Sequence, residues 1–127
     1  MKRFATRTVE VALDEEGIVA ARIQPGQVQT VEDARANLAA AFAACGGLRR
    51  PLLLDLRHAV EQPAEVRHVY SGPVMNEFFT AIALLVRARP LERIIASIYL
   101  RVTKPNLPTR LFEDEDAARI WLRQATS

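Results

Sequence analysis

Apolar and polar residues alternate along the first part of the chain. Val9, Val11 and Leu13 share one side, and polar residues stand between them. A period of two is typical of a half-buried β-strand. Residues 14–17 then predict a tight turn, since they end in a glycine that can adopt positive φ. With residues 18–23 as a second strand, the pattern predicts an N-terminal antiparallel hairpin.

The spacing of apolar residues then changes to three and four, which is typical of a helix. Thr30 is a suitable N-cap, and Asp33 stands three residues later as a weak form of a capping box. Gly46 and Gly47 provide a stop signal. The predicted helix therefore spans about residues 31–45, with an inner stripe of Val31, Ala34, Leu38, Ala41, Phe42 and Cys45.

Residues 51–58 contain the densest group of leucines. Leu52, Leu54 and Leu56 would face one way in a strand, and Leu53 and Asp55 the other. Apolar residues on both faces indicate a strand that is covered on both sides. We expect this segment to be the central strand.

A pair of helices is expected next, one from Pro63 to about residue 70 and one over residues 73–86, because each proline suits a first helical turn. The stripe of the second helix is wide enough to need more than one neighbour. It consists of Val74, Met75, Phe78, Phe79, Ile82, Leu85 and Val86.

The last third predicts a long strand over residues 94–102, a short edge strand at Leu111 and Phe112, and a final helix. The acidic residues 113–116 suit the positive end of the helix dipole. We expect the inner face of this helix to consist of Ala117, Ile120, Trp121 and Gln124.

The order of elements predicts an α/β fold for a single domain over residues 1–127. It would hold a single-layer mixed sheet of four to five strands with packed helices: the N-terminal hairpin is antiparallel, and right-handed crossovers make the remaining strands parallel.

Composition narrows the functional classes only slightly. The 127 residues are 50% hydrophobic and 25% charged, with a net charge of +2. Arginines are dispersed and alternate with acids, so we expect no nucleic-acid partner. Cys45 is the only cysteine, which favours a reducing compartment. The polar N-terminus does not resemble a signal peptide, and the apolar block at 81–86 is too short to span a bilayer. We therefore expect a cytoplasmic protein.

Several segments resemble the STAS domain superfamily in its SpoIIAA-like branch. They are residues 53–57, the predicted helix of residues 79–86 leading to 94–100, Lys104-Pro105, residues 108–115, Ala117 and Trp121-Leu122. The resemblance implies a bacterial regulatory module that binds another protein or itself, without a cofactor.

In anti-sigma-factor antagonists of that superfamily, a phosphorylatable serine follows the central strand. The matching residues here, 58–63, contain no serine or threonine. The nearest hydroxyl downstream is Ser71, our candidate phosphorylation site, although its position is not equivalent.

Asp55, His58 and His68 are the residues that suggest acid–base chemistry. A carboxylate that orients a histidine is a known catalytic pairing. Alternatively, Asp55 pins the end of its strand through backbone N–H groups and His58 lies in solvent. We prefer the second interpretation because no nucleophile lies close in sequence. The histidine spacing matches no metal site. We therefore predict no catalytic residue, no metal and no enzyme activity.

Two further groups are candidate binding residues. Lys104, Asn106, Thr109 and Arg110 could hold an anion beyond a strand end, or could simply lie in a rigid proline-bearing connection. The second group, Tyr70, Met75, Phe78 and Phe79, could form a partner-binding patch or belong to the core.

Cys45 is expected to be a buried structural thiol on the helix stripe. The preferred function is a non-enzymatic interaction module that docks a partner protein or self-associates. The alternative is a domain that binds a small apolar or lipid-like ligand. This alternative predicts an internal pocket beside residues 74–86.

Overall fold

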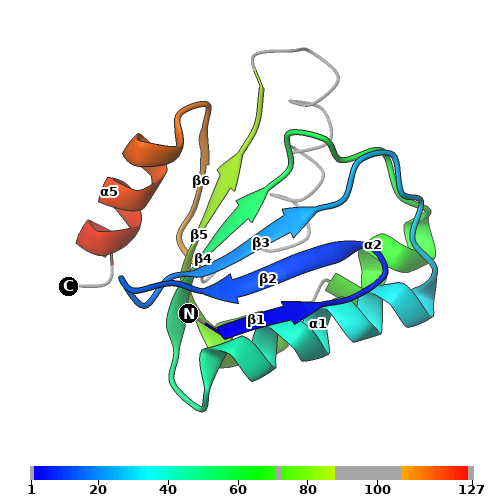
Figure 1. Ribbon diagram of the computed structural model, residues 1–127, viewed down its shortest axis with the longest axis horizontal. Helices are drawn as coiled ribbons and strands as arrows, with labels where there is room; N and C mark the ends of the chain where they lie inside the picture. Colours follow the sequence, from blue (N-terminus) through cyan, green and yellow to red (C-terminus); the bar gives the residue numbers. More distant parts are fainter. Residues whose placement is uncertain (1, 71–72, 88–106, 126–127) are drawn as a thin grey trace.

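The computed structural model describes residues 2–70, 73–87 and 107–125, and every structural statement below concerns these residues. They form a mixed sheet with helices on both faces (Figure 1). The sheet has six strands in the order β1-β2-β3-β4-β5-β6. The strands are β1 (Lys2–Ala5), β2 (Val9–Leu13), β3 (Val19–Ile23), β4 (Arg50–Asp55), β5 (Phe79–Leu85) and β6 (Thr109–Phe112); the helices are α1 (Val31–Cys45), α2 (Ala64–Tyr70), α3 (Val74–Phe78) and α5 (Glu115–Ala125).

The predicted hairpin is confirmed by the antiparallel pairing of β2 with β3, in which Leu13 pairs with Val19. Gly17 closes its turn at a φ of 79°. The antiparallel edge strand β1 was not predicted. Its burial pattern offers little signal, since Phe4 alone is partly buried.

Strand β4 is central and parallel to both neighbours, as predicted. Leu52 belongs to the core under α1, and Leu53 to the core under α5. The register with β5 shifts at Pro51: Arg50 pairs with Phe79, but Leu52 pairs with Ile82. Because proline has no N–H for the ladder, a bulge opposite Pro51 lets β5 continue without that bond.

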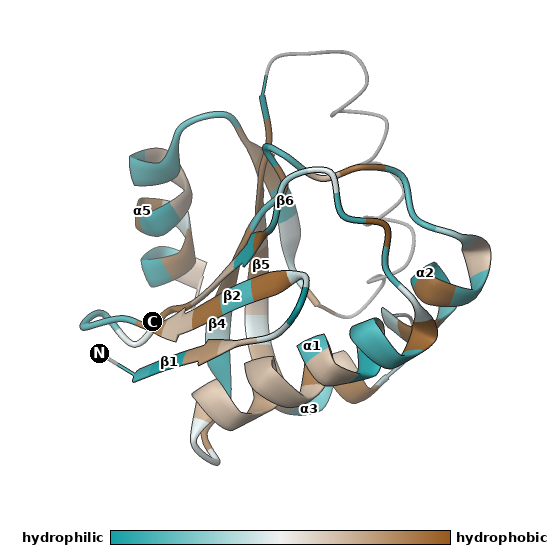
Figure 2. Cartoon of the chain, turned by 45° about the vertical axis from the view of Figure 1, so that its right-hand side comes forward, coloured by the Kyte–Doolittle hydropathy of each residue, from teal (hydrophilic) through white to brown (hydrophobic). Residues whose placement is uncertain are grey.

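The helices divide between the two faces. Figure 2 shows α1, α2 and α3 on one face and α5 on the other. Helix α1 has the predicted capping box of Thr30 and Asp33, and it ends at Gly46 with a φ of 62°. It lies over β1–β3, whereas α5 packs on β4–β6. On one face of the sheet a long helix, α1, covers β1–β3. On the other face a long helix, α5, covers β4–β6.

The predicted helix over residues 73–86 is wrong beyond its first turns. Helix α3 ends at Phe78, and Phe79 already has extended backbone, with φ −119° and ψ 148°. The following run is β5, whose residues 81–85 are all buried. A short apolar run fits a strand buried on both faces as well as a helix, so hydrophobicity alone did not separate the two.

The inner face predicted for the last helix is also wrong, although the helix itself is confirmed. Ala118 and Leu122 are its buried residues. Ala117 and Gln124 are exposed, and Ile120 is 48% exposed. Trp121 is the predicted inner residue that does pack, with its ring 5.6 Å from that of Phe112.

The predicted edge strand at Leu111 and Phe112 is confirmed as β6, and the helix predicted after Pro63 is confirmed as α2. The long strand predicted over residues 94–102 lies outside the described residues. In the described structure, β5, whose residues were predicted as a helix, lies beside β4.

Candidate functional site

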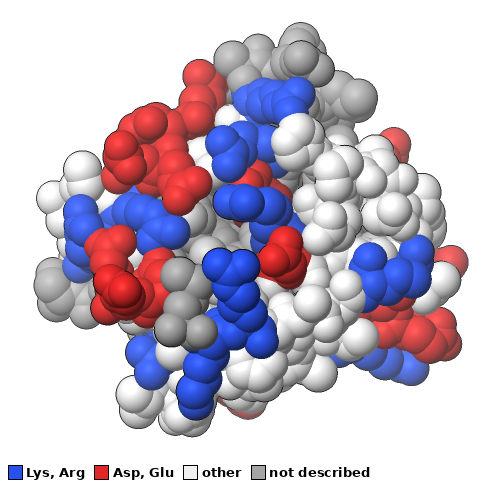
Figure 3. Space-filling view, in the orientation of Figure 1, with Lys and Arg blue, Asp and Glu red and all other residues white. Residues whose placement is uncertain are grey.

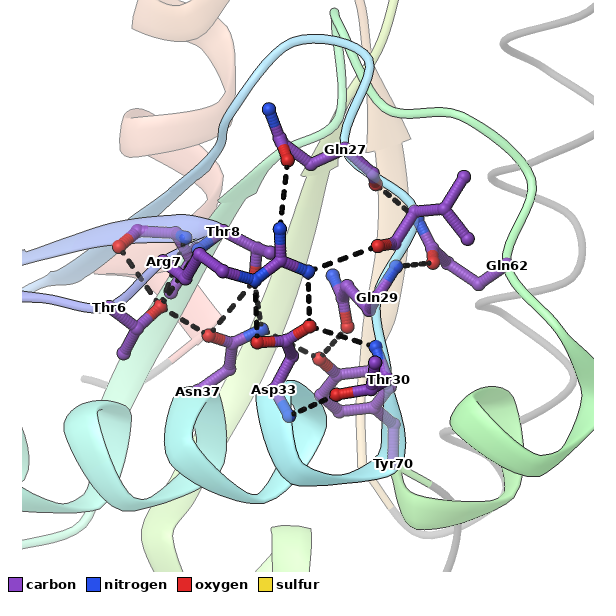
Figure 4. Close-up of polar contacts among 12 residues, drawn as sticks. Thr6, Arg7, Thr8, Gln27, Gln29, Thr30, Asp33, Asn37, Gln62 and Tyr70 are labelled. Atoms are coloured by element: carbon purple, nitrogen blue, oxygen red, sulfur yellow. Dashed lines mark hydrogen bonds and ion pairs between the residues drawn. The ribbon is translucent and has the colours of Figure 1, made fainter.

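Polar side chains gather where β3 and β4 end and α1 begins. We call Thr6, Thr8, Gln29, Asn37, Gln62 and Tyr70 the polar cluster (Figure 4). Four of these residues are at least 94% buried: Thr8, Gln29, Asn37 and Gln62. Ligands of open α/β sheets usually bind at the carboxyl ends of parallel strands, which makes this the first place to look for a site.

Asn37 on α1 is the centre of the polar cluster. Its Nδ2 donates to Thr8 Oγ1 at 2.9 Å and to the Tyr70 hydroxyl at 3.0 Å. Its Oδ1 accepts hydrogen bonds from the hydroxyls of Thr6 and Thr8. Tyr70 in turn donates to Gln29 Oε1. Asn37 therefore links the β1–β2 turn, α1 and α2.

Gln62 joins two loops at the same rim. Its Oε1 accepts a hydrogen bond from the backbone N–H of Gln29 at 2.6 Å, and its Nε2 donates to the carbonyl of Gln27 at 2.9 Å. Nε2 also donates to the carbonyl of Val60 at 3.2 Å. This one amide fixes the β3–α1 loop against the β4–α2 segment.

Arg7 completes the outer part of this rim. Its Nε donates to Asp33 Oδ1 at 3.0 Å, and its other N–H groups reach Gln27 Oε1 and the carbonyl of Val28. The hydrogen bond from Arg7, followed by that from the backbone N–H of Thr30, holds the pKa of Asp33 well below its usual value. The side chain of Val28 is 57% exposed at this fixed rim.

The polar cluster is chemically suited to holding segments in place, not to proton transfer. Amides and threonine hydroxyls do not titrate near neutral pH. Burial raises the pKa of Tyr70 to about 12, so its hydroxyl stays protonated and acts as a donor. Within the polar cluster, Gln29 Nε2 is buried without a hydrogen-bond partner among the described residues.

An apolar cavity of about 60 Å³ adjoins the polar cluster. Carbon atoms form nearly all of its wall, and Asn37 and Tyr70 belong to its lining. The remaining lining residues come from four strands and from α1 and α3: Val9, Val11, Ala21, Ile23, Leu38, Ala41, Leu52, Leu54, Met75, Phe79 and Ile82.

The opposite face of the sheet carries an arginine network around Asp55. Arg57 binds both carboxylate oxygens of Asp55, at 3.0 and 2.8 Å, and its backbone N–H also donates to Oδ1. The Nε of Arg22 lies 3.3 Å from Asp55 Oδ2. Burial would raise the pKa of Asp55, but these hydrogen bonds and charges outweigh burial and lower it.

Arg119 extends the arginine network to the β2–β3 turn. It pairs with Asp14, with Glu16 at 3.2 Å and with Glu115 at 3.1 Å. Glu115 also lies 3.8 Å from Arg57. The network therefore joins α5 to both ends of the sheet.

The structure places Asp55 at its strand end, with a backbone N–H bond from Arg57, as our preferred interpretation proposed. His58 is exposed and contacts Arg87 instead of Asp55. His68 is exposed on α2. Cys45 is fully buried, and burial raises the pKa of its thiol. In the described part of the chain, no group of three or more histidine, cysteine, aspartate and glutamate residues could hold a metal ion.

The predicted partner-binding patch does not form as expected. Met75 is 6% exposed and Phe79 is fully buried, so both belong to the core. Phe78 is half-buried because its ring stacks on that of Phe42 at 3.7 Å. Tyr70 is half-buried and belongs to the polar cluster. Phe79 opens β5 instead of continuing the helix, and its side chain there lies in the core.

The predicted anion-binding loop is only partly described. Lys104 and Asn106, as well as Ser71, lie outside the described residues. Thr109 and Arg110 belong to β6 and not to a loop. Thr109 donates its hydroxyl hydrogen bond to the carbonyl of Leu107 at 2.9 Å, and the Arg110 guanidinium lies 5.2 Å from the centre of the Phe112 ring.

Sequence reasoning named Tyr70 for a partner-binding patch and missed the other residues that build the polar cluster. Asn37 could have been recognised from the sequence, because it falls on the inner side of α1 between Ala34 and Ala41. A polar residue at such a position is buried and needs partners. Gln29 and Gln62 lie in irregular segments, where no comparable local pattern marks a buried residue.

Comparison with solved structures shows the fold. The chain is similar to an uncharacterized protein from the DUF3478 family with a SpoIIAA-like fold, from Shewanella loihica PV-4, at a TM-score of 0.60 and 14% identity. The match covers 94% of this chain and 98% of that one. The fold is therefore SpoIIAA-like. A protein with unknown function from Arthrobacter sp. FB24 matches over 95% of this chain and 97% of its own, at 25% identity and a TM-score of 0.34.

No curated protein matches this chain. Within the described ranges, the helices are all too short or too polar to cross a membrane. The family described as "Domain of unknown function (DUF7793)" matches residues 12–126. The chain therefore belongs to this family.

Proposed function

We propose that this protein is a non-enzymatic interaction module of STAS type, which docks a partner protein at the rim where β3 and β4 end. The observation that carries the proposal is the fixed rim: Gln62 and Arg7 hold the β3–α1 loop in place, with Val28 exposed on it. A pre-ordered loop loses little conformational entropy on binding, which favours a docking role.

The rim also suggests how such a module would differ from a phosphorylation switch. Residues 58–63 stand where the resemblance places a phosphorylatable serine, and here Gln62 is buried in that segment. Its hydrogen bonds to the backbone of Gln27 and Gln29 hold the rim in one state. We infer that docking is constitutive and is regulated by the amount or state of the partner.

Affinity capture from the native lysate tests this proposal when it is done with matched variants. Val28→Glu places a charge on the rim, whereas Leu48→Glu changes a residue that is 61% exposed beyond the other end of α1. We expect wild type and Leu48→Glu to recover the same partner, and Val28→Glu to lose it. Recovery of no specific partner, or equal recovery by both variants, would contradict the proposal.

The cavity favours a second candidate function, the binding of a small apolar ligand. Its volume of about 60 Å³ exceeds the roughly 10–15 Å³ that one water needs. It is smaller than the roughly 150 Å³ of an engineered cavity that binds benzene. A short hydrocarbon group fits this size better than a whole lipid.

Ala41→Leu would fill this cavity from α1, and Ala39→Leu is a matched control on the exposed side of the same helix. We expect short-chain alcohols to raise the melting temperature of wild type and Ala39→Leu, and not that of Ala41→Leu. Equal shifts in all three proteins would contradict binding in the cavity.

A further inference from the structure

Among the described residues, no helix covers one half of the sheet on the α5 side. Helix α5 packs on β4–β6, and the same face of β1–β3 borders a hollow of about 190 Å³. The small side chains of Ala12 and Ala20 lie at its floor, next to each other across β2 and β3. The hollow is lined further by Arg3, Glu10, Arg22, Asp55, Glu115 and Arg119, with Val11, Ala21 and Leu53.

The outer face of α5 carries the feature that would fill such a hollow. Ala118 and Leu122 define the buried side of the helix. Ile120 follows Ala118 by two residues, or about 200°, so it points away from the protein's own sheet. Its side chain is 48% exposed, and it is the large apolar side chain exposed on this helix.

The charges beside these two surfaces are complementary. In the described structure, Asp116 on the outer face of α5 makes no ion pair. Arg22 contacts one carboxylate, that of Asp55, and its side chain remains 62% exposed. Figure 3 shows acidic side chains over the N-terminal end of α5 and basic side chains beside them over the sheet, with basic side chains also over the rest of the helix.

We propose that a second copy of this chain covers the uncovered half, with each α5 lying on the partner's β1–β3. A two-fold axis parallel to α5 produces this arrangement, because it exchanges the two halves of the sheet but keeps the direction of the helices. Each α5 is then held between its own β4–β6 and the partner's β1–β3. The interface is isologous, as expected for a C2 dimer.

The axial positions of the residues agree with this symmetry. Glu115 lies level with the ends of β3 and β4, since it is 3.8 Å from Arg57. Ile120 lies five residues further along α5, or about 7.5 Å. Ala20 precedes Arg22 by two strand residues, or about 6.6 Å. The partner's Ile120 therefore reaches the level of Ala12 and Ala20, and the partner's Asp116 that of Arg22.

Analytical ultracentrifugation of the full chain over a concentration series tests the dimer. We expect wild type to associate reversibly, and Ile120→Asp to raise the dissociation constant at least about tenfold, as for a central apolar contact. Leu48→Asp is the control, since Leu48 is exposed beyond the C-terminal end of α1, and α1 lies on the opposite face of the sheet from α5 (Figure 2). Circular dichroism should show an unchanged fold in both variants, because both side chains are exposed.

A mixing experiment identifies the contact without relying on a loss of binding. Ala20→Cys and Ile120→Cys are prepared separately, mixed and oxidised mildly. The proposed pairing predicts a cross-linked heterodimer from the mixture, and little cross-linking of either variant alone. Cys45 is fully buried and does not compete.

A wild type that stays monomeric up to about millimolar concentration would overturn the proposal. So would a dimer that Ile120→Asp leaves intact, or a mixture that gives no cross-link. These results do not bear on partner docking at the rim, because Val28 and Gln62 lie in the loops before α1 and α2 and not on α5.

Discussion

The polar cluster beside α1 and the arginine network beside α5 hold the same sheet to its surroundings with different chemistry. The polar cluster uses neutral groups: Asn37, Gln62 and Tyr70 join several loops through hydrogen bonds in a buried place. The arginine network uses ions, with Asp55 and Arg119 at its centres. Buried hydrogen bonds between neutral groups depend little on salt and pH. Exposed ion pairs weaken when salt is added and when acid protonates their carboxylates.

The difference indicates where each region can be altered. A buried neutral network is costly when one member is lost, because the remaining donors and acceptors keep no contact with water. A partly exposed ion pair costs less to remove, since water solvates the partner that remains. Stability should therefore rest more on the polar cluster, and the pH dependence at low pH more on Asp55.

The largest effect is expected for Asn37→Ala. The substitution removes the hydrogen bonds that Asn37 makes to the buried hydroxyls of Thr8 and Tyr70. It should therefore lower the free energy of unfolding by about 2–3 kcal/mol. Urea denaturation measures this loss. Asn76→Ala is the control, because Asn76 is only partly buried on α3. Equal losses in the two variants would remove the special role of the polar cluster.

Asp55→Asn should have the next largest effect, a loss of about 1–3 kcal/mol at pH 7, because Arg57 loses a charged bidentate partner. The pKa of Asp55 is lowered in the folded protein. Its contribution is therefore full above the unfolded value near 4 and is lost as pH falls below it.

Denaturation of both proteins between pH 7 and pH 2 measures this contribution. The difference between wild type and Asp55→Asn should shrink at the acidic end. A difference that stays constant over this range would show that the charge of Asp55 is not the cause.

Tyr70→Phe should cost about 1 kcal/mol, since it removes one hydroxyl that bonds to both Asn37 and Gln29. The pKa of Tyr70 is raised to about 12, above its usual value of 10.0. The neutral form is favoured by folding, so its stabilising effect is complete below pH 10 and declines between pH 10 and pH 12. Denaturation at pH 8 and pH 11 should show a smaller alkaline loss for Tyr70→Phe than for wild type.

Arg119→Gln should have the smallest effect, about 0.5–1 kcal/mol at low salt, because such pairs are partly exposed. The arginine network should respond to added salt, so the difference between wild type and variant should fall in 1 M NaCl. The Asn37→Ala difference should not change under the same conditions. The opposite salt response would reverse the assignment of neutral and ionic regions.

Local signals predicted the elements whose sequence offers one conformation. The capping box of Thr30 and Asp33 and the stop at Gly46 fixed the ends of α1, and the alternating pattern fixed β2. The prediction failed where two conformations fit equally well. The run of residues 79–86 is apolar except for Thr80 and fits a helix as well as a strand, and its parallel pairing with β4 decided for a strand.

The candidate sites divide in the same way. Asp55 could be recognised as a polar residue in an apolar strand, and its role at the strand end followed from its position. Asn37, Gln29 and Gln62 come together from separate segments, so no local spacing showed that they would meet. Ile120 is exposed because of how α5 packs on the sheet, and Val28 is exposed on the β3–α1 loop that Arg7 holds at the rim.

By itself, the sequence determined an α/β fold with a central leucine-rich strand, because hydrophobic period, caps and turn residues act over a few positions. Only the tertiary structure decided which side of α5 is buried, that Met75 and Phe79 belong to the core, and that three neutral amides meet at the rim beside Val28. These features depend on contacts between residues far apart in the chain. Burial and hydrogen bonding select among the arrangements that local propensity leaves open.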